Sequence, residues 1–289
     1  MSAQLLAALR ADQYLNVDVK LLNGWDRIST HSYRNATPVA QPFPFFLFAP
    51  GLGMSRASYT TLAEELASRG IIVAMADHPY CGLSVYPDGK LRAYTAIKRK
   101  AEELVQDIAD DQSFLLQELS KATPFGLKID WSRVVVGGHS IGGAAALQTG
   151  RGNATIKGAI DLDGDVWGDV EASGTRKPFL TLLNRPGLPV QIPLGMQKER
   201  TEEWESVLAK SDVTARVITI GPAYHFTFSD VPFLLPLRVL RESGATMDPM
   251  RSRSVIARLI ESYIKSDRGK FDKVAASIDE AQVLLRKDR

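Results

Sequence analysis

The chain has 289 residues, of which 45% are hydrophobic and 24% charged, an ordinary composition for a globular protein. Its 35 basic and 33 acidic residues leave a formal net charge of only +2, so neither nucleic acid nor an anionic membrane is expected as a partner. A single cysteine, Cys81, excludes an internal disulfide and a cysteine-based metal site.

No apolar run approaches the roughly 20 residues that a membrane span needs, so a soluble protein is predicted. The apolar stretch near the start is interrupted by Arg10 and Asp12 and lacks a basic leader, unlike a signal peptide. We therefore expect a cytoplasmic protein, or a secreted one if a leader has been removed.

Short apolar runs alternate with amphipathic segments along most of the chain. Runs that are hydrophobic on both faces are typical of strands covered by helices on both sides, and apolar stripes with a helical period predict helices between them. In chain order the predicted elements are strand 45–49, helix 59–69, strand 71–76, helix 97–121, strand 134–136, helix 144–148, strands 158–162 and 179–183, helix 197–210, strand 215–220 and helices 251–265 and 270–286.

This alternation predicts an α/β fold: a mostly parallel central sheet with helices on both faces and no large lid domain. Residues 17–34 resemble, less clearly, a pair of strands at one sheet edge. We expect one domain over residues 1–289, with edge strands and an N-terminal extension at 1–40 and C-terminal helices at 250–289. No repeat or low-complexity linker favours an internal boundary.

The pentad Gly138-His139-Ser140-Ile141-Gly142 carries the main functional signal. It stands between a predicted strand and a predicted helix, where a sharp turn with small flanking residues exposes a nucleophilic serine hydroxyl at the end of a sheet. The alternative is a Gly-rich turn whose serine only caps the helix. The strand-turn-helix context favours Ser140 as the nucleophile.

A serine hydroxyl needs a base, and the chain offers four histidines. His139 lies beside the nucleophile and should point into packing, and His31 is most simply a surface residue. His78 precedes Ser140 in the chain, so it is more suited to lining a pocket or bonding a loop. His225 follows the predicted strand 215–220 at the edge of the sheet where ligands gather, and it is the predicted base.

The acid that orients the base is harder to place. In the commonest arrangement of such serine enzymes the acid follows the strand at 179–183, but residues 184–190 contain no carboxylate. We call the turn at residues 138–142 the elbow. The strand directly after the helix that follows the elbow ends in Asp161, Asp163 and Asp165. Asp163, at the strand end before a glycine, is the predicted acid, and Asp161 is the main alternative. The triplet lacks the glycine and glutamate of a calcium loop, so no metal is predicted.

Two backbone amides are predicted to stabilise the oxyanion of a tetrahedral intermediate. One belongs to Ile141, the residue after the nucleophile. The other is assigned to Leu52, between the two glycines of the loop that follows the strand at 45–49. The alternative is that this glycine pair forms only a tight turn.

With Ser140, Asp163 and His225 in this order, the chain resembles the α/β-hydrolase superfamily and, within it, the platelet-activating factor acetylhydrolase family of the plasma and bacterial type. The resemblance implies the α/β-hydrolase fold, an acid after the strand that follows the elbow, and a Gly-Leu-Gly oxyanion loop. Pro50, where members often have histidine, and the additional Asp161 depart from the family pattern. The likeness is carried by residues 49–53, 58–77, 138–143, 160–164 and 225–230.

These residues predict a serine carboxylic ester hydrolase that acts through an acyl-enzyme on short-chain or small acyl esters, acetyl esters of phospholipids included. The alternatives are a polyester or lipid hydrolase with the same triad, a lyase, peptidase or acyltransferase on the same fold, and a non-catalytic binding protein. The expected partner is a small-molecule ester, and no cofactor is expected. The residues predicted to bind substrate are Trp167, Tyr224, Phe226 and Phe228, and the loop at 80–94 is the predicted mobile rim.

Overall fold

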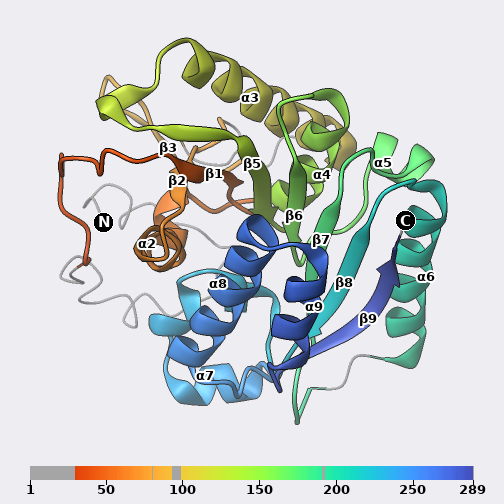
Figure 1. Ribbon diagram of the computed structural model, residues 1–289. Coiled ribbons are helices and arrows are strands. Elements are labelled where there is room, and N and C mark those ends of the chain that lie inside the picture. The colour runs from red at the N-terminus through yellow and green to blue at the C-terminus, as the bar shows by residue number, and fades with distance from the viewer. Residues whose placement is uncertain (1–29, 80, 93–98, 191–192, 289) are drawn as a thin grey trace.

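The computed structural model of the chain describes residues 30–79, 81–92, 99–190 and 193–288. Within these residues the centre of the molecule is a seven-stranded sheet in the order β2-β1-β5-β6-β7-β8-β9 (Figure 1). Every neighbouring pair is parallel except β8 and β9, which run antiparallel. The predicted mostly parallel sheet of an α/β fold is therefore confirmed.

The central strands follow from their sequence, because β-branched and aromatic residues fill both faces. Val134, Val135 and Val136 of β5 are all buried, as expected of a strand covered on both sides. The strands are β1 (Phe43–Ala49), β2 (Ile72–Met75), β5 (Ile129–His139), β6 (Gly158–Leu162), β7 (Phe179–Asn184), β8 (Ala215–Ile220) and β9 (Ala281–Lys287), beside a separate antiparallel pair, β3 (Ser84–Val85) and β4 (Leu91–Arg92).

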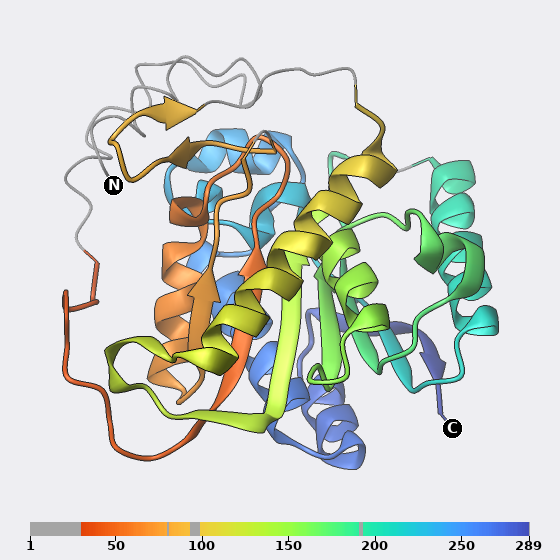
Figure 2. The ribbon, with the colours of Figure 1, turned by 90° about the horizontal axis from the view of Figure 1, so that it is seen from above.

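The helices cover the two faces of the sheet. Figure 2 places α3 and α4 on one side of the strands and α8 on the other. The bounds are α2 (Thr60–Ser68), α3 (Ala101–Lys121), α4 (Ile141–Gly152), α5 (Asp169–Ser173), α6 (Leu194–Lys210), α7 (Leu237–Glu242), α8 (Pro249–Lys265) and α9 (Arg268–Ala276), with 3₁₀ turns at Arg56–Tyr59, Pro124–Gly126, His225–Phe228 and Val231–Phe233.

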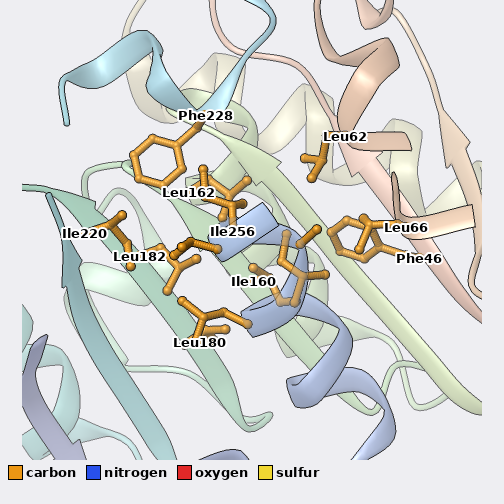
Figure 3. Close-up of a cluster of buried hydrophobic side chains, with 14 of the residues drawn as sticks. Phe46, Leu62, Leu66, Ile160, Leu162, Leu180, Leu182, Ile220, Phe228 and Ile256 are labelled. Carbon is orange, nitrogen blue, oxygen red and sulfur yellow. The ribbon is translucent and has the colours of Figure 1, made fainter. Parts of the chain in front are cut away.

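Alternate side chains of each strand enter two separate cores. In β1, Phe46 and Phe48 point toward the core under α2, α8 and α9, part of which is drawn in Figure 3. Phe45 and Leu47 point toward the core under α3, α4 and α6, where Trp204 is fully buried. The period of two along β1 therefore fixes the strand between the two helical layers.

The prediction of a final helix over residues 270–286 is wrong in its second half. Helix α9 ends at Ala276, and the chain turns back as β9, which pairs with β8 from Ala215 to Ile220. Without β9 the backbone of β8 would form an open sheet edge, so pairing at that edge outweighs the helical pattern. It also means that the strand at 215–220 is not the last one and that 250–289 is not purely helical.

Several other predicted boundaries change. The helix expected at 144–148 extends over Ile141–Gly152, and the helix expected from residue 97 begins at Ala101 within the described residues. Residues 30–40 form no strand, and the rest of the expected N-terminal strands lies outside the described residues. The described part of the loop at 80–94 contains the β3–β4 hairpin.

No helix in the described ranges has the length and apolar character needed to cross a membrane.

Candidate active site

Ser140 occupies a tight turn between β5 and α4. Its φ of 55° and ψ of −125° lie outside the regions that a non-glycine residue normally occupies. A Cβ on Gly138 would collide with Gly142, and one on Gly142 would collide with the backbone of Ala49. The two glycines are therefore what allows β1, the turn and α4 to come this close.

His139 is fully buried and joins the elbow to two loops. Its Nδ1 lies 2.8 Å from the hydroxyl of Tyr59, and its Nε2 lies 2.9 Å from the backbone oxygen of His225. Because a carbonyl only accepts, Nε2 carries the proton and Nδ1 accepts from Tyr59. Burial, followed by the nearby His225, lowers the pKa of His139 to about 3, so it remains a neutral structural group, as its expected position in packing implies.

This hydrogen-bond chain continues to the loop after β1. The backbone N–H of Gly51 donates to the Tyr59 hydroxyl over 3.0 Å. The loop carrying Leu52, the elbow and the loop carrying His225 are thus linked through two buried side chains, Tyr59 and His139.

Asp163 and His225 form a direct hydrogen bond, with 2.7 Å between Asp163 Oδ2 and His225 Nδ1. Asp163 follows β6, and its side chain is 1% exposed, whereas the His225 side chain is 39% exposed. A φ of 59° at Asp163 turns the chain at the strand end. The structure therefore brings together a buried carboxylate and a solvent-accessible imidazole.

The Asp163 carboxylate receives three further hydrogen bonds. Asn184, the last residue of β7, donates its backbone N–H to Oδ1 over 2.8 Å and its side-chain amide to Oδ2 over 2.9 Å. Arg200, on α6, donates to Oδ1 over 2.8 Å. Burial acts to raise the pKa of the Asp163 carboxyl, but the bond to His225, the Arg200 charge and the Asn184 bond outweigh it and hold this pKa below its ordinary value.

Asp161, the alternative acid, occupies a different environment on β6. Its Oδ1 accepts from the Gly164 N–H over 2.9 Å, and its buried Oδ2 has no hydrogen-bond partner among the described residues. Burial and then the charge of Asp163 raise its pKa well above the ordinary value. The pKa values of the two neighbouring aspartates are therefore shifted in opposite directions, upward for Asp161 and downward for Asp163, and of the two only Asp163 is bonded to His225 in the described part of the chain.

Ser140 and His225 come from loops that lie against each other. The ring centroids of His139, adjacent to Ser140, and His225 are 4.5 Å apart. In the described structure no hydrogen bond joins the Ser140 hydroxyl to His225, and such bonds are often long before substrate binds and shorten in the complex.

Both predicted oxyanion donors have a free backbone N–H within the described residues. In the loop after β1, the Gly51 N–H is bonded to Tyr59 and the Gly53 N–H to the Cys81 oxygen over 2.7 Å. The N–H of Leu52 between them has no acceptor there. Ile141 is the first residue of α4, where an amide has no partner inside the helix.

The predicted substrate-binding side chains lie in different places. Trp167 is partly buried, beside Leu52 of the predicted oxyanion loop, against an apolar cluster that includes Ile141 and Cys81. Tyr224 and Phe226 flank His225 with partial exposure. Phe228, the fourth predicted residue, differs from the other three because its side chain is only 2% exposed. Figure 3 shows its ring above Leu162, Leu182, Ile220 and Ile256 in the hydrophobic core, so in this structure it offers almost no surface to a ligand.

The remaining histidines lie elsewhere. His31 is exposed, and His78 is buried with its Nδ1 2.8 Å from a carboxylate oxygen of Asp111 on α3. In the described ranges no group of three or more His, Cys, Asp or Glu side chains could hold a metal ion.

Asn184 and Arg200 were not among the predicted site residues. The position of Asn184 could have indicated its role, because it ends the strand after which the commonest arrangement of such enzymes places the acid. The sequence gives no indication for Arg200, which lies 37 residues from Asp163 and reaches it through the packing of α6.

The comparison with known families agrees with this architecture. Residues 46–285 match the sequence model of the alpha/beta hydrolase family. The chain belongs to this family. The matched region includes the elbow, both aspartates, His225 and most of β9.

Proteins named as esterases or acetylhydrolases are among the relatives of this chain. The chain is 25% identical over 237 residues to a probable 1-alkyl-2-acetylglycerophosphocholine esterase of Arthroderma benhamiae, and the alignment covers 77% of this chain and 58% of the relative. It is 24% identical over 237 residues to a platelet-activating factor acetylhydrolase of Gallus gallus, over 67% of this chain and 54% of the relative. The resemblance to the acetylhydrolases is confirmed, and the chain spans about half the length of these curated relatives.

A solved structure resembles the chain over most of its length. Ferulic acid esterase from Streptomyces cinnamoneus superposes with a TM-score of 0.73 and 28% sequence identity, covering 86% of this chain and 75% of that chain. The α/β-hydrolase fold is thereby confirmed.

Proposed function

We propose that this α/β hydrolase is a serine carboxylic ester hydrolase in which Ser140 is the nucleophile, His225 the base and Asp163 the orienting acid. The observation that carries the proposal is the 2.7 Å bond between His225 and the buried Asp163, on a loop packed against the elbow of Ser140. A serine, a base and an acid that orients the base are the parts that nucleophilic acyl transfer needs.

The proposed reaction has two stages. As Ser140 Oγ bonds to the ester carbonyl carbon, its proton passes to His225 Nε2, and the carbonyl oxygen becomes an oxyanion beside the amides of Leu52 and Ile141. The ester bond then breaks, and the alcohol leaves with the proton from His225. Water, deprotonated by His225, attacks the acyl-enzyme, and Ser140 regains its proton as the carboxylic acid departs.

The electrostatics of Asp163 support its proposed role. An ionised carboxylate at His225 Nδ1 keeps the proton on that nitrogen, leaves Nε2 free to accept from Ser140, and stabilises the imidazolium that forms. Asn184 and Arg200 supply the hydrogen bonds and charge that keep a 1%-exposed carboxylate ionised.

For the substrate we propose a small acyl ester. Leu52 and Trp167 provide partly exposed apolar surface next to Ile141, which suits a short or planar acyl group. Relatives named as acetylhydrolases and a neighbour named as a ferulic acid esterase favour an acetyl ester first and an aromatic acyl ester second.

A panel of substrates tests the proposal. We expect kcat/KM for p-nitrophenyl acetate and butyrate to exceed that for the dodecanoate by about tenfold or more. Each added methylene loses conformational entropy when it is ordered, and it must bury apolar surface to offset that loss. A feruloyl ester, an acetyl phospholipid, a polyester film and an amino-acid p-nitroanilide complete the panel. Cleavage of the anilide without ester turnover would contradict the proposal, and rapid release from the film would favour the polyester alternative.

A further inference from the structure

We propose that Arg200 is a positioning residue: its guanidinium holds the Asp163 carboxylate against His225 and thereby sets the lower pH limit of activity. This inference rests on the proposed triad. Arg200 acts through Asp163 and forms no hydrogen bond or ion pair with Ser140 or with His225 among the described residues.

The geometry gives Arg200 a defined task. Asp163 Oδ1 accepts from Asn184 N and Arg200 Nη2, both at 2.8 Å, while Oδ2 accepts from Asn184 Nδ2 at 2.9 Å and faces His225 Nδ1 at 2.7 Å. Donors from β7 and from α6 therefore fix the orientation of the carboxylate, and Oδ2 is presented to the imidazole. Without Arg200, Asn184 would be the remaining donor besides His225 among the described residues.

The charges around this carboxylate form a small set. On β6 and the loop after it, burial and the charge of Asp163 raise the pKa of Asp161, and Asp165 is exposed. On β5, His139 is neutral at a pKa of about 3. On α6, burial raises the pKa of Glu203, and the charge of Arg200 acts against that rise.

Among the described residues, Arg200 pairs directly with the buried carboxylate of Asp163. Its own guanidinium stays charged, since the Asp163 charge and hydrogen bond more than offset its burial and raise its pKa. Arg200 and Asp163 thus form an ion pair beside the proposed base, in which the Arg200 side chain is 26% exposed and the Asp163 side chain 1% exposed.

The sign of the effect follows from this arrangement. The positive charge of Arg200 is one of the causes that lower the pKa of the Asp163 carboxyl. Removing that charge raises this pKa, so Asp163 takes up a proton, and ceases to orient His225 as an anion, at a higher pH. Activity at mildly acid pH is therefore lost, whereas activity at alkaline pH falls only through poorer orientation of His225.

The test is the pH profile of kcat/KM for p-nitrophenyl acetate in Arg200→Gln. We expect the pH of half-maximal activity on the acid side to rise by about half to one unit, consistent with one charge at this separation in a partly solvated site. We also expect kcat at pH 8 to fall about tenfold. Arg200→Met, which retains the bulk of the stem without the charge, should show the same shift and replaces the glutamine variant if that one does not fold.

Two variants serve as controls. Arg200→Lys retains the charge but not the planar donor fork, so its acid limit should stay within about 0.2 pH units of that of the original chain while kcat falls. Lys198→Gln alters an exposed neighbour on α6 whose ion pair, among the described residues, is with Glu202, and it should change neither quantity. Unfolding temperatures of all variants show whether each is folded.

The outcomes separate this inference from the proposed triad. An unchanged or lowered acid limit in folded Arg200→Gln or Arg200→Met would overturn the positioning role, even with reduced kcat, because a purely structural residue lowers the rate without moving the profile. Turnover that persists in Ser140→Ala would overturn the triad itself, whatever the Arg200 variants do.

Discussion

Replacing Ser140 with alanine is expected to lower kcat for p-nitrophenyl acetate by about three to six orders of magnitude. Without the hydroxyl no acyl-enzyme forms, and only the oxyanion donors and substrate binding remain to assist attack by water. The rate is measured with the purified variant against the original chain in the same buffer at pH 8.

The fold should survive this change. Alanine keeps a Cβ at the same φ of 55°, so the backbone strain is the same in both proteins and the unfolding temperature should shift little. Ser132→Ala is the matched control, since Ser132 is exposed near the start of β5 and, within the described part of the chain, its hydroxyl bonds to Asp130. A Ser140→Ala enzyme with more than a tenth of the original rate would contradict the assignment.

Asp163→Asn is expected to lower kcat by about four orders of magnitude, whereas Asp161→Asn should change it less than tenfold. An amide at position 163 presents no charge and allows the wrong tautomer of His225. Asp161 has no bond to His225 among the described residues, burial and the Asp163 charge raise its pKa, and asparagine can still accept from Gly164. Both rates are measured with the same short ester.

The pair also differs in its effect on stability. A carboxyl with a raised pKa in the folded state, such as Asp161, stabilises the fold fully below its unfolded pKa, and this contribution is lost as the pH rises through the folded value. Relative to the original chain, Asp161→Asn should thus gain stability in urea unfolding as the pH rises above the ordinary pKa of an aspartic acid. Equal loss of activity in the two variants would remove the distinction drawn between the aspartates.

The sheet could be predicted because its signals are local. Runs such as Val134 to Val136 are apolar on both faces, and each is bounded by residues that favour turns. The strand β9 has no such signal: Ala281–Lys287 is mostly exposed and forms because β8 offers an unpaired edge. The partners of β9 on β8 lie 61 to 72 residues earlier in the chain. A short stretch of sequence around β9 therefore gives no indication that a strand forms there.

The candidate site also combines local and long-range signals. Ser140 stands in a local motif and His225 follows a recognisable strand, so both could be proposed as site residues from the sequence. The sequence left Asp161 and Asp163 as rivals, and the distinction depends on a positive φ at Asp163 that turns its side chain to His225, while Asp161 stays in the strand beneath the elbow. Arg200 reaches the site only through tertiary packing.

The most direct test of the proposed nucleophile is covalent labelling with a fluorophosphonate, followed by mass spectrometry of the digested protein. The account predicts one phosphonyl group per chain on the peptide that contains Ser140, slower labelling in Asp163→Asn, and none in Ser140→Ala. Labelling at another residue, or no labelling of a protein that hydrolyses the short ester, would contradict it.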